Sequence, residues 1–338
     1  MGYNFNSNMK YKASEDYALF DLHLHLDGAL SSEIIIKIAK GEGIELPTYN
    51  PEELEKLLRV SDTCSSLNEY LEKFDLPNLV LQTKYGLKEA TTDLLNRLAS
   101  QGLKYVELRM APQLSTAEGL SQEEVVETLL EVINNNPPLK VRLILCLMRG
   151  ASKEKNMTTV EVAKKYLGKG VVAIDLAGAE ALYPNTLYEE EFNKAKENNI
   201  PFTIHAGEAA DYHSVDSALN MGATRIGHGI HCADSLMTIF NLGRKKIPLE
   251  VCPTSNLQTG AIVFFEDFRL KELFDTGLVI TINTDNPTVS HTTLRDEYRL
   301  LSRMGFDQVD VYRIALNTLE ASFLNEEEKE ELKKYINE

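Results

Sequence analysis

The sequence has few cysteines and fewer basic than acidic side chains. Its four cysteines lie far apart and form no C-x-x-C pair, which argues against a disulfide framework and favours a reduced, cytoplasmic protein. The 51 Asp and Glu residues exceed the 35 Lys and Arg residues, so the formal net charge is −16. This acidic balance argues against non-specific binding to nucleic acid or to an anionic membrane surface.

Long apolar segments, repeats and linkers are also missing. No apolar run approaches the ~20 residues that a membrane-spanning helix needs, and the polar N-terminal segment has no apolar core of a secretory signal. We find no internal repeat, low-complexity segment or Pro/Gly-rich linker that would divide the chain. We therefore expect a soluble protein and a single domain over residues 1–338.

Eight short apolar runs alternate with longer amphipathic stretches. Each run has 7–9 residues and most are rich in Val, Ile and Leu, as strands buried in a parallel sheet are. Strand and helix alternating eight times predict an α/β fold, a (β/α)8 TIM barrel, with a doubly wound open sheet as the rival. The runs cover residues 18–24, 104–110, 140–148, 170–177, 200–206, 223–229, 247–253 and 277–284.

Helical patterns separate the runs. Ser121 and Glu124 form a capping box at the start of one helix, and Pro51 begins another. Residues 77–101 have a helical period and stop before Gly102, a residue type common just after helix ends. Further helices are expected at residues 158–167, 188–198, 212–221, 234–243, 267–276 and 291–304, and a charged, solvated terminal helix at 324–338.

About 80 residues separate the first two runs, too many for a single strand–helix unit. They contain roughly four helical segments, within about residues 30–100. An insertion after the first strand lies over the C-terminal mouth of a barrel, where it can act as a lid. Leu67, Leu71 and Phe74 share a helical period and are candidates to line a pocket; simple packing of the insertion helices explains them equally well.

Polar side chains gather where the predicted strands end. His23 and His25 close the first strand and, being two residues apart, project from the same face. His205 closes the fifth strand, His228 closes the sixth, and Asp285 follows the eighth. In a barrel these ends converge on one mouth, where active sites lie. Three imidazoles and a carboxylate suit a zinc ion and leave one position open for water.

Glu208 lies three residues after His205, on the turn that leaves the fifth predicted strand. A zinc ion lowers the pKa of water toward ~7 and so supplies hydroxide, and a proton must then reach the leaving group. Glu208 is the natural residue for this transfer; its alternative role is to cap the following helix. His228, between Gly227 and Gly229, can orient the hydroxide.

Six motifs with these residues occur in a recognisable order. They are His23-Leu-His25-Leu-Asp27-Gly28, Asp175-Leu-Ala-Gly178, His205-Ala-Gly-Glu208, Arg225-Ile-Gly-His228-Gly229, Cys252-Pro-Thr-Ser-Asn256 and Asn283-Thr-Asp285. Together they resemble the adenosine deaminase family within the amidohydrolase superfamily. The resemblance extends from the first predicted strand to beyond the eighth.

The resemblance implies a zinc-dependent hydrolase of purine salvage. Members of the family are (β/α)8 barrels that remove the 6-amino group of adenosine and 2′-deoxyadenosine, giving inosine compounds and ammonia. A second metal ion is not expected, because the fourth strand ends in IDLAGAE and offers no lysine to bridge two ions. The resemblance implies one zinc ion (Zn2+) per subunit with four ligands: His23, His25, His205 and Asp285.

The same resemblance implies three catalytic residues. Glu208 would protonate purine N1 while hydroxide attacks C6. His228 would assist at the hydroxide, and Asp285 would help to deprotonate the water from which it forms.

Four residues would bind substrate by the same resemblance. The backbone of Gly178 would contact purine N3, Asp27 would bind the ribose 5′-hydroxyl, and His25 would face the substrate as well as the metal. Asn286 stands where many members of the family carry an aspartate that is thought to bond purine N7. An asparagine amide can donate to the same atom.

Alternative substrates share this fold and zinc chemistry: adenine, or a 5′-modified or N6-methylated adenosine. A nucleotide is disfavoured, because Asp27 would repel a 5′-phosphate and the net charge of −16 gives no attraction. A non-catalytic zinc protein is the alternative from another class. The cytidine-deaminase pattern does not fit, because Cys252-Pro253 has no second cysteine. We expect a small-molecule nucleoside partner, no nucleic acid or membrane, and a monomer or homodimer.

We expect Asn286→Asp to leave zinc bound but to add a pH dependence to kcat/KM. An amide donates to purine N7 at any working pH, whereas a carboxyl group donates only while protonated. Metal analysis and a pH profile with adenosine measure the two effects. An unchanged profile would argue against N7 recognition by this residue.

Overall fold

The computed structural model describes residues 12–61, 64, 66–135 and 137–338. The first eleven residues, which carry part of the expectation about a secretory signal, lie outside this part of the chain. None of the described helices combines the length and the hydropathy that crossing a bilayer requires.

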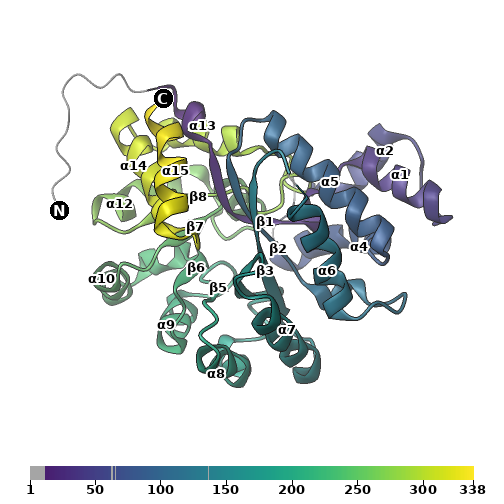
Figure 1. Ribbon diagram of the computed structural model, residues 1–338. Helices are drawn as coiled ribbons and strands as arrows, with labels where there is room; N and C mark the ends of the chain where they lie inside the picture. Colours follow the sequence, from purple (N-terminus) through teal and green to yellow (C-terminus); the bar gives the residue numbers. More distant parts are fainter. Residues whose placement is uncertain (1–11, 62–63, 65, 136) are drawn as a thin grey trace.

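Eight parallel strands form the centre of the molecule (Figure 1). Consecutive strands pair in chain order, β1 to β4 in one sheet and β5 to β8 in another. Isolated parallel bridges join the two sheets at both seams, Ile174 with Phe202 and Leu24 with Asp285. This order is that of the predicted (β/α)8 barrel, and the doubly wound alternative is wrong. The strands are β1 Phe20–His25, β2 Tyr105–Met110, β3 Lys140–Met148, β4 Val171–Ala177, β5 Thr203–Ala206, β6 Arg225–His228, β7 Leu249–Val251 and β8 Ile280–Ile282.

Each predicted run contains one strand, but the last four strands are shorter than predicted. Gly229 follows β6 directly with a φ of 71°, outside the extended region. Pro253 begins a helix two residues after the end of β7. Gly277, at the start of the last predicted run, has a φ of 90°, so β8 begins later. Local backbone geometry therefore sets these strand ends.

Helices surround the strands (Figure 1) and match most of the predicted segments. They are α1 Ser32–Glu42, α2 Pro51–Leu58, α3 Leu67–Leu71, α4 Asp75–Val80, α5 Lys84–Ser100, α6 Gln122–Ile133, α7 Lys153–Tyr166, α8 Glu189–Glu197, α9 Tyr212–Met221, α10 Leu236–Lys245, α11 Pro253–Gln258, α12 Leu270–Asp275, α13 Leu294–Arg303, α14 Gln308–Ala321 and α15 Glu326–Asn337. The capping box predicted at the start of α6 is present.

Residues 77–101 form two helices rather than the single one that their period predicts. α4 ends at Val80 and α5 begins at Lys84. Thr83 adopts an extended conformation between them, and its side chain accepts a hydrogen bond from Gly86 N. This N-cap starts a new helix and so divides the periodic segment.

Three further helices differ from the prediction. Ser152 caps α7, which therefore begins at Lys153 rather than at residue 158. α11 begins at Pro253, inside a motif that the sequence analysis uses only for recognition. α14 was not predicted, although Asp307 opens it with a capping box. Caps, more than periodicity, determine where these helices begin.

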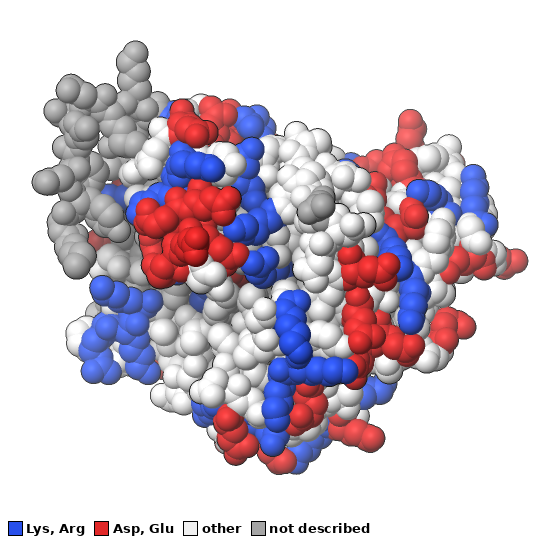
Figure 2. Space-filling model, viewed as in Figure 1, with Lys and Arg blue, Asp and Glu red and all other residues white. Residues whose placement is uncertain are grey.

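The terminal helix α15 has the solvated, charged face that the sequence predicts. Leu332 and Ile336 are its buried residues, and the helix packs against α14. Figure 2 shows acidic side chains gathered over this part of the surface with basic ones beside them. The exposed acidic residues of α15 include Glu326, Glu327, Glu330 and Glu331.

In the described part of the chain, the α-helices α1 to α4 lie between β1 and α5, the helix that precedes β2. α1 and α2 project from one side of the barrel (Figure 1). Val60 N donates a hydrogen bond to Val289 O at 3.0 Å, and the Tyr70 hydroxyl lies 2.7 Å from Ser290 Oγ. These contacts attach the insertion to the loop that follows β8.

We expect Gly86→Ala to destabilise the protein, although alanine is the better helix former. Its methyl group would lie 2.0 Å from Val80 O, so the α4–α5 junction must shift, which typically costs about 1–3 kcal/mol. Gly243→Ala in α10 is the matched control, because that methyl group meets Leu278 at an ordinary 3.6 Å. It should stabilise the protein by up to about 1 kcal/mol. Urea unfolding measures both, and equal changes would contradict the packing argument.

Candidate metal and active site

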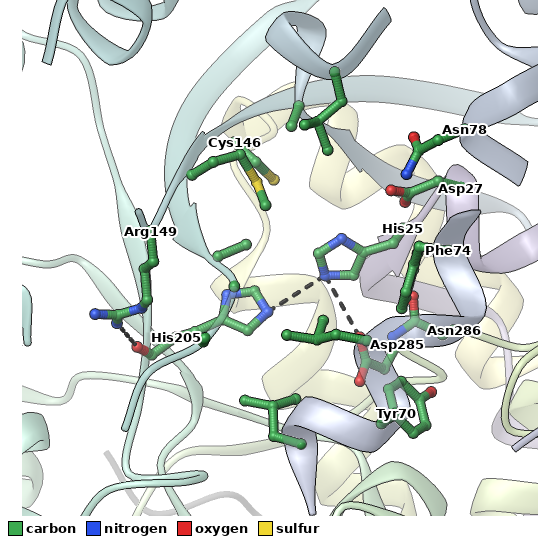
Figure 3. A pocket seen from close by; sticks show the side chains of 18 of the residues that line it. His25, Asp27, Tyr70, Phe74, Asn78, Cys146, Arg149, His205, Asp285 and Asn286 are labelled. Atoms are coloured by element: carbon green, nitrogen blue, oxygen red, sulfur yellow. Dashed lines mark hydrogen bonds and ion pairs between the residues drawn. The ribbon is translucent and has the colours of Figure 1, made fainter. Parts of the chain in front are cut away.

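The four predicted metal ligands meet at the carboxyl ends of the strands. His23 Nε2 lies 3.0 Å from His205 Nε2, and His25 Nε2 lies 3.3 Å from both. Asp285 Oδ1 lies 3.5 Å from His23 Nε2 and 3.4 Å from His25 Nε2. Figure 3 shows His205 and Asp285 both facing His25. Residues separated by more than 250 positions in the sequence therefore place one atom each around a common centre.

The spacing of these atoms fits a tetrahedral metal ion. Ligand atoms 2.0–2.1 Å from one ion would lie about 3.3 Å from each other, and the observed distances are 3.0–3.5 Å. The Nδ1 atoms of His23 and His205 face carboxylates, so their Nε2 lone pairs point toward the common centre. Without a cation, lone pairs that face one another at this centre repel. A cation between them would be attracted to each of the four atoms. These four side chains therefore form a candidate metal-binding group, one that could hold an ion.

A second set of ligand atoms, which includes Cys252 and His228, is also close enough to hold an ion. Burial raises the pKa of the Cys252 thiol well above its usual value, and its Sγ is directed to Glu250 O at 3.5 Å. A neutral thiol is a poor ligand, because metals bind the thiolate. The set with three imidazoles and Asp285 is therefore the better metal site.

A buried ion-pair network supports the histidines from below. Glu250 Oε2 lies 2.8 Å from His23 Nδ1, and Asp175 Oδ2 lies 2.9 Å from His205 Nδ1. Arg109 donates to Glu250 at 2.8 Å and to Asp175 at 2.9 Å. The side chains of Arg109, Asp175 and Glu250 are all 0% exposed. One guanidinium thus joins the two carboxylates that orient two of the ligands.

Arg225 extends this network across the barrel. It donates to Glu250 Oε1 at 2.6 Å and to Glu107 Oε2 at 2.5 Å. Burial alone would raise the pKa of Glu250, but Arg109 and Arg225 hold it well below its usual value. The buried charges alternate in sign, so Glu250 stays ionised.

Glu208 lies beside the metal-binding group and lines the same cavity. Its Oε2 is 3.5 Å from His228 Nε2, and its buried Oε1 has no hydrogen-bond partner within the described residues. Burial, together with the charges of Asp285 and Glu180, raises the pKa of Glu208 well above its usual value. This environment favours the protonated form of Glu208, the form that a general acid needs.

His228 is a neutral imidazole with a defined tautomer. Asn256 Nδ2 lies 2.9 Å from His228 Nδ1 and donates to it, which leaves the ring proton on Nε2. Burial and the neighbouring His23 lower the pKa of His228 well below its usual value. The Nε2–H group therefore faces the cavity as a hydrogen-bond donor.

His228 and Asp285 both have left-handed backbones, with φ of 58° and 62°. Such a conformation costs a non-glycine residue about 1–3 kcal/mol and persists only where the surroundings hold it. The backbone of Asp285 donates to His23 O at 2.7 Å and accepts from His25 N at 2.8 Å. Ser255 Oγ also donates to Asp285 Oδ2 at 2.6 Å. Two of the described non-glycine residues with a positive φ are thus predicted catalytic residues; Asn199, Lys246 and His291 are the others.

A cavity of about 300 Å³ opens above the metal-binding group (Figure 3). This volume is at the lower end of the range for small-molecule sites. Of the two interpretations of the insertion helices, pocket lining is correct. The wall on that side is formed by Leu67, Leu71 and Phe74, and the apolar wall from the barrel by Ala111, Cys146, Met148 and Ala177.

The four predicted substrate-binding residues, His25, Asp27, Gly178 and Asn286, all line this cavity. Asp27 Oδ1 and Asn286 Oδ1 are buried and have no hydrogen-bond partner in the described part of the chain. Burial raises the pKa of Asp27 to about 6, although backbone N–H groups of Asp27 and Gly28 oppose this change. Two polar atoms are thus available to a ligand.

Comparison with known proteins identifies the family. The family model described as "Adenosine deaminase" matches residues 19–338. The chain belongs to the adenosine deaminase family. An adenosine deaminase of Haemophilus ducreyi is 45% identical over 329 residues, which are 95% of this chain and 96% of that protein. One from Clostridium botulinum (strain Loch Maree) is 44% identical over 324 residues, 94% of this chain and 96% of that protein.

Solved structures agree with this membership of the adenosine deaminase family. An adenine deaminase from Arthrobacter aurescens superposes with a TM-score of 0.85 and 27% identity, over 94% of this chain and 98% of that one. The family resemblance and the α/β-barrel fold are therefore confirmed. The protein is an enzyme, a hydrolase that acts on a C–N bond.

Sequence reasoning missed the residues that support the site from outside the cavity. The strands β2 and β7 are mostly apolar but contain the charged residues Glu107, Arg109 and Glu250. A charged residue inside an apolar strand is the sequence signal that could have identified this network. Ser255 and Asn256 lie in a motif of the adenosine deaminase family, but their contacts with Asp285 and His228 follow only from the placement of α11.

We expect Glu250→Gln to lower the free energy of unfolding by about 3–5 kcal/mol, because Arg109 and Arg225 would lose a buried anionic partner. Glu190→Gln is the control. It removes a carboxylate that pairs with Lys153 at the surface and should change stability little. Urea unfolding of both variants makes the comparison, and a small change in each would contradict a central role for the network.

Proposed function

We propose that this protein hydrolyses adenosine and 2′-deoxyadenosine to inosine and 2′-deoxyinosine and releases ammonia, with one zinc ion per subunit. One observation carries the proposal: Glu208, a buried acid with a raised pKa, lines the same cavity as His25, His205 and Asp285, three of the four side chains that could hold a metal ion. The substrate assignment is supported by the 45% identity, over 95% of this chain, to an adenosine deaminase.

The zinc ion would be held by His23, His25, His205 and Asp285. Three imidazole nitrogens and one carboxylate oxygen are donors that zinc accepts, and carboxylates orient two of the imidazoles. When bound, zinc supplies a nucleophile at neutral pH, because it lowers the pKa of water to ≈ 7.

Three side chains move or direct protons in the proposed reaction. Asp285 would accept the proton that the attacking water loses. It is available as an ionised carboxylate, because His23 holds its pKa below its usual value despite burial. His228 donates its Nε2–H to the attacking oxygen. Glu208 donates its proton to purine N1, which makes C6 more electrophilic. The C6–O bond forms, the amino group takes up the proton that Asp285 had accepted, and the C6–N bond breaks to release ammonia. The proton of the new C6 hydroxyl group returns to Glu208, which leaves a 6-oxo product protonated at N1.

Substrate orientation would come from polar groups around an apolar slot. The backbone N–H of Gly178 donates to purine N3, and the Asn286 amide donates to N7. Asp27 accepts a hydrogen bond from the ribose 5′-hydroxyl. Asp27 and Asp75 both line the cavity, and two carboxylates there disfavour a 5′-phosphate. His25 faces both substrate and zinc.

The insertion within residues 30–100 acts as a lid in this proposal, on a single domain that spans residues 1–338. Its helices α3 and α4 contribute Leu67, Leu71 and Asn78 to the cavity, and the short 3-10 helix Glu72–Phe74 between them contributes Phe74. These side chains would exclude water from the bound base, which strengthens the polar contacts beneath.

The proposed function is tested by incubating zinc-loaded protein with adenosine, 2′-deoxyadenosine, adenine, N6-methyladenosine and AMP. Ammonia release and the change in purine absorbance report turnover. We expect kcat/KM to be highest for the two unmodified nucleosides and turnover to stop when a chelator removes zinc. Faster turnover of adenine, the substrate named for the structural relative, would overturn the assignment.

We expect Glu208→Gln to lower kcat at least about 100-fold while zinc stays bound, because an amide cannot donate the acid proton. Adenosine turnover and metal analysis of the purified variant are the two measurements. Loss of zinc would point to misfolding of the site, and full activity would exclude Glu208 as the acid.

A further inference from the structure

Glu180 is a buried carboxylate, 2% exposed, in the loop that follows β4. Its Oε1 also accepts a hydrogen bond from Ser214 Oγ at 2.5 Å. The two oxygens together accept, at 2.7–3.1 Å, the N–H groups of four consecutive residues: Gly207, Glu208, Ala209 and Ala210. One side chain thus holds the whole turn that carries Glu208.

These four N–H groups lie before α9 and are not the free donors of its first turn. Asp211 is the N-cap of α9, where its side chain accepts from His213 N at 3.0 Å. Capping of this helix therefore explains neither Glu208 nor Glu180. The contacts of Glu180 are made to the connection between β5 and α9, which has no regular hydrogen bonding of its own.

The side chain of Glu208 has few contacts that would position it. Its Oε1 has no partner within the described residues, and its Oε2 is 3.5 Å from His228 Nε2. A side-chain contact with Thr259 also acts on the carboxyl group and opposes the rise of its pKa. Beyond these neighbours, the place of the carboxyl group depends on the backbone beneath it. That backbone turns sharply: Gly207 has a φ of 69°, and a Cβ there would lie 2.5 Å from Val215 Cγ2.

We propose that Glu180 is the positioning residue for Glu208: by binding four successive N–H groups it fixes the turn from which the acid reaches the substrate. The inference rests on the proposed role of Glu208. A misplacement of about 1 Å in a catalytic group can cost ~100-fold in rate. The charge of Glu180 also acts on the acid, because after burial and Asp285 it is a cause of the raised pKa of Glu208.

The first test is Glu180→Gln. A carboxamide has the same shape, but its NH2 group would face N–H donors instead of accepting from them. We expect kcat for adenosine to fall 10–100-fold, KM to change less than 3-fold and the zinc content to stay the same. Glu180→Asp, which keeps the acceptors, should lose less. Asp211→Ala, which removes the neighbouring helix cap, should keep the native kcat.

The second test is a double-mutant cycle with Glu208→Gln. If Glu180 acts through the acid, Glu180→Gln should have almost no further effect on kcat in the Glu208→Gln background. An equal fold-loss in both backgrounds would overturn the inference, as would a native kcat for Glu180→Gln alone. If Glu180→Gln does not fold, the same double-mutant cycle with Glu180→Asp tests whether Glu180 acts through Glu208. Full activity of Glu208→Gln alone would instead exclude Glu208 as the acid, and this inference with it, but would leave the proposed hydrolysis of adenosine standing.

Discussion

The ion pairs of Arg109 with Glu250 and Asp175 are the interaction on which the site depends. Each carboxylate binds the Nδ1 side of one imidazole, so two Nε2 lone pairs are turned toward the mouth of the barrel. Inside a low-dielectric core a charge cannot be removed without leaving its partners uncompensated. The geometry of the metal-binding group is therefore determined by the side chains that lie beneath it in the barrel. These side chains contact the histidines but do not line the cavity.

Above this layer, parts of the fold contribute different properties to one cavity. The strand ends supply metal-binding atoms in fixed positions, a turn supplies the acid, and the insertion supplies apolar surface. The pKa values of the two nearby carboxyl groups of Glu208 and Asp285 are shifted in opposite directions because their surroundings differ. Glu208 has an unpartnered oxygen and carboxylates as neighbours, whereas Asp285 faces imidazoles and accepts from Ser255. One type of group, the carboxyl group, can thus serve as a proton donor at one position and as a proton acceptor at another.

The sequence predicts the barrel and the residues around the cavity because both follow from local signals. The apolar runs predict the strands. The polar residues at the ends of these runs must lie together at the C-terminal mouth of a barrel, which predicts the site. The supporting network could not be predicted in this way, since Arg109 and Glu250 are 141 positions apart and pair only through tertiary structure. The break before Thr83 and the ends of the short strands depend on single caps and left-handed glycines, which periodicity does not register.

Asp285 has a second place in the molecule, because its backbone pairs with β1 on both sides and forms the bridge between the last and first strands. Its side chain meanwhile belongs to the metal-binding group. Whatever occupies that group therefore also ties the two ends of the strand cylinder together. Occupancy and closure would then be linked equilibria: an ion bound there would stabilise the closed seam, and an open seam would release the ion. Asp285 therefore contributes both to the proposed chemistry, through its side chain, and to the closure of the barrel, through its backbone.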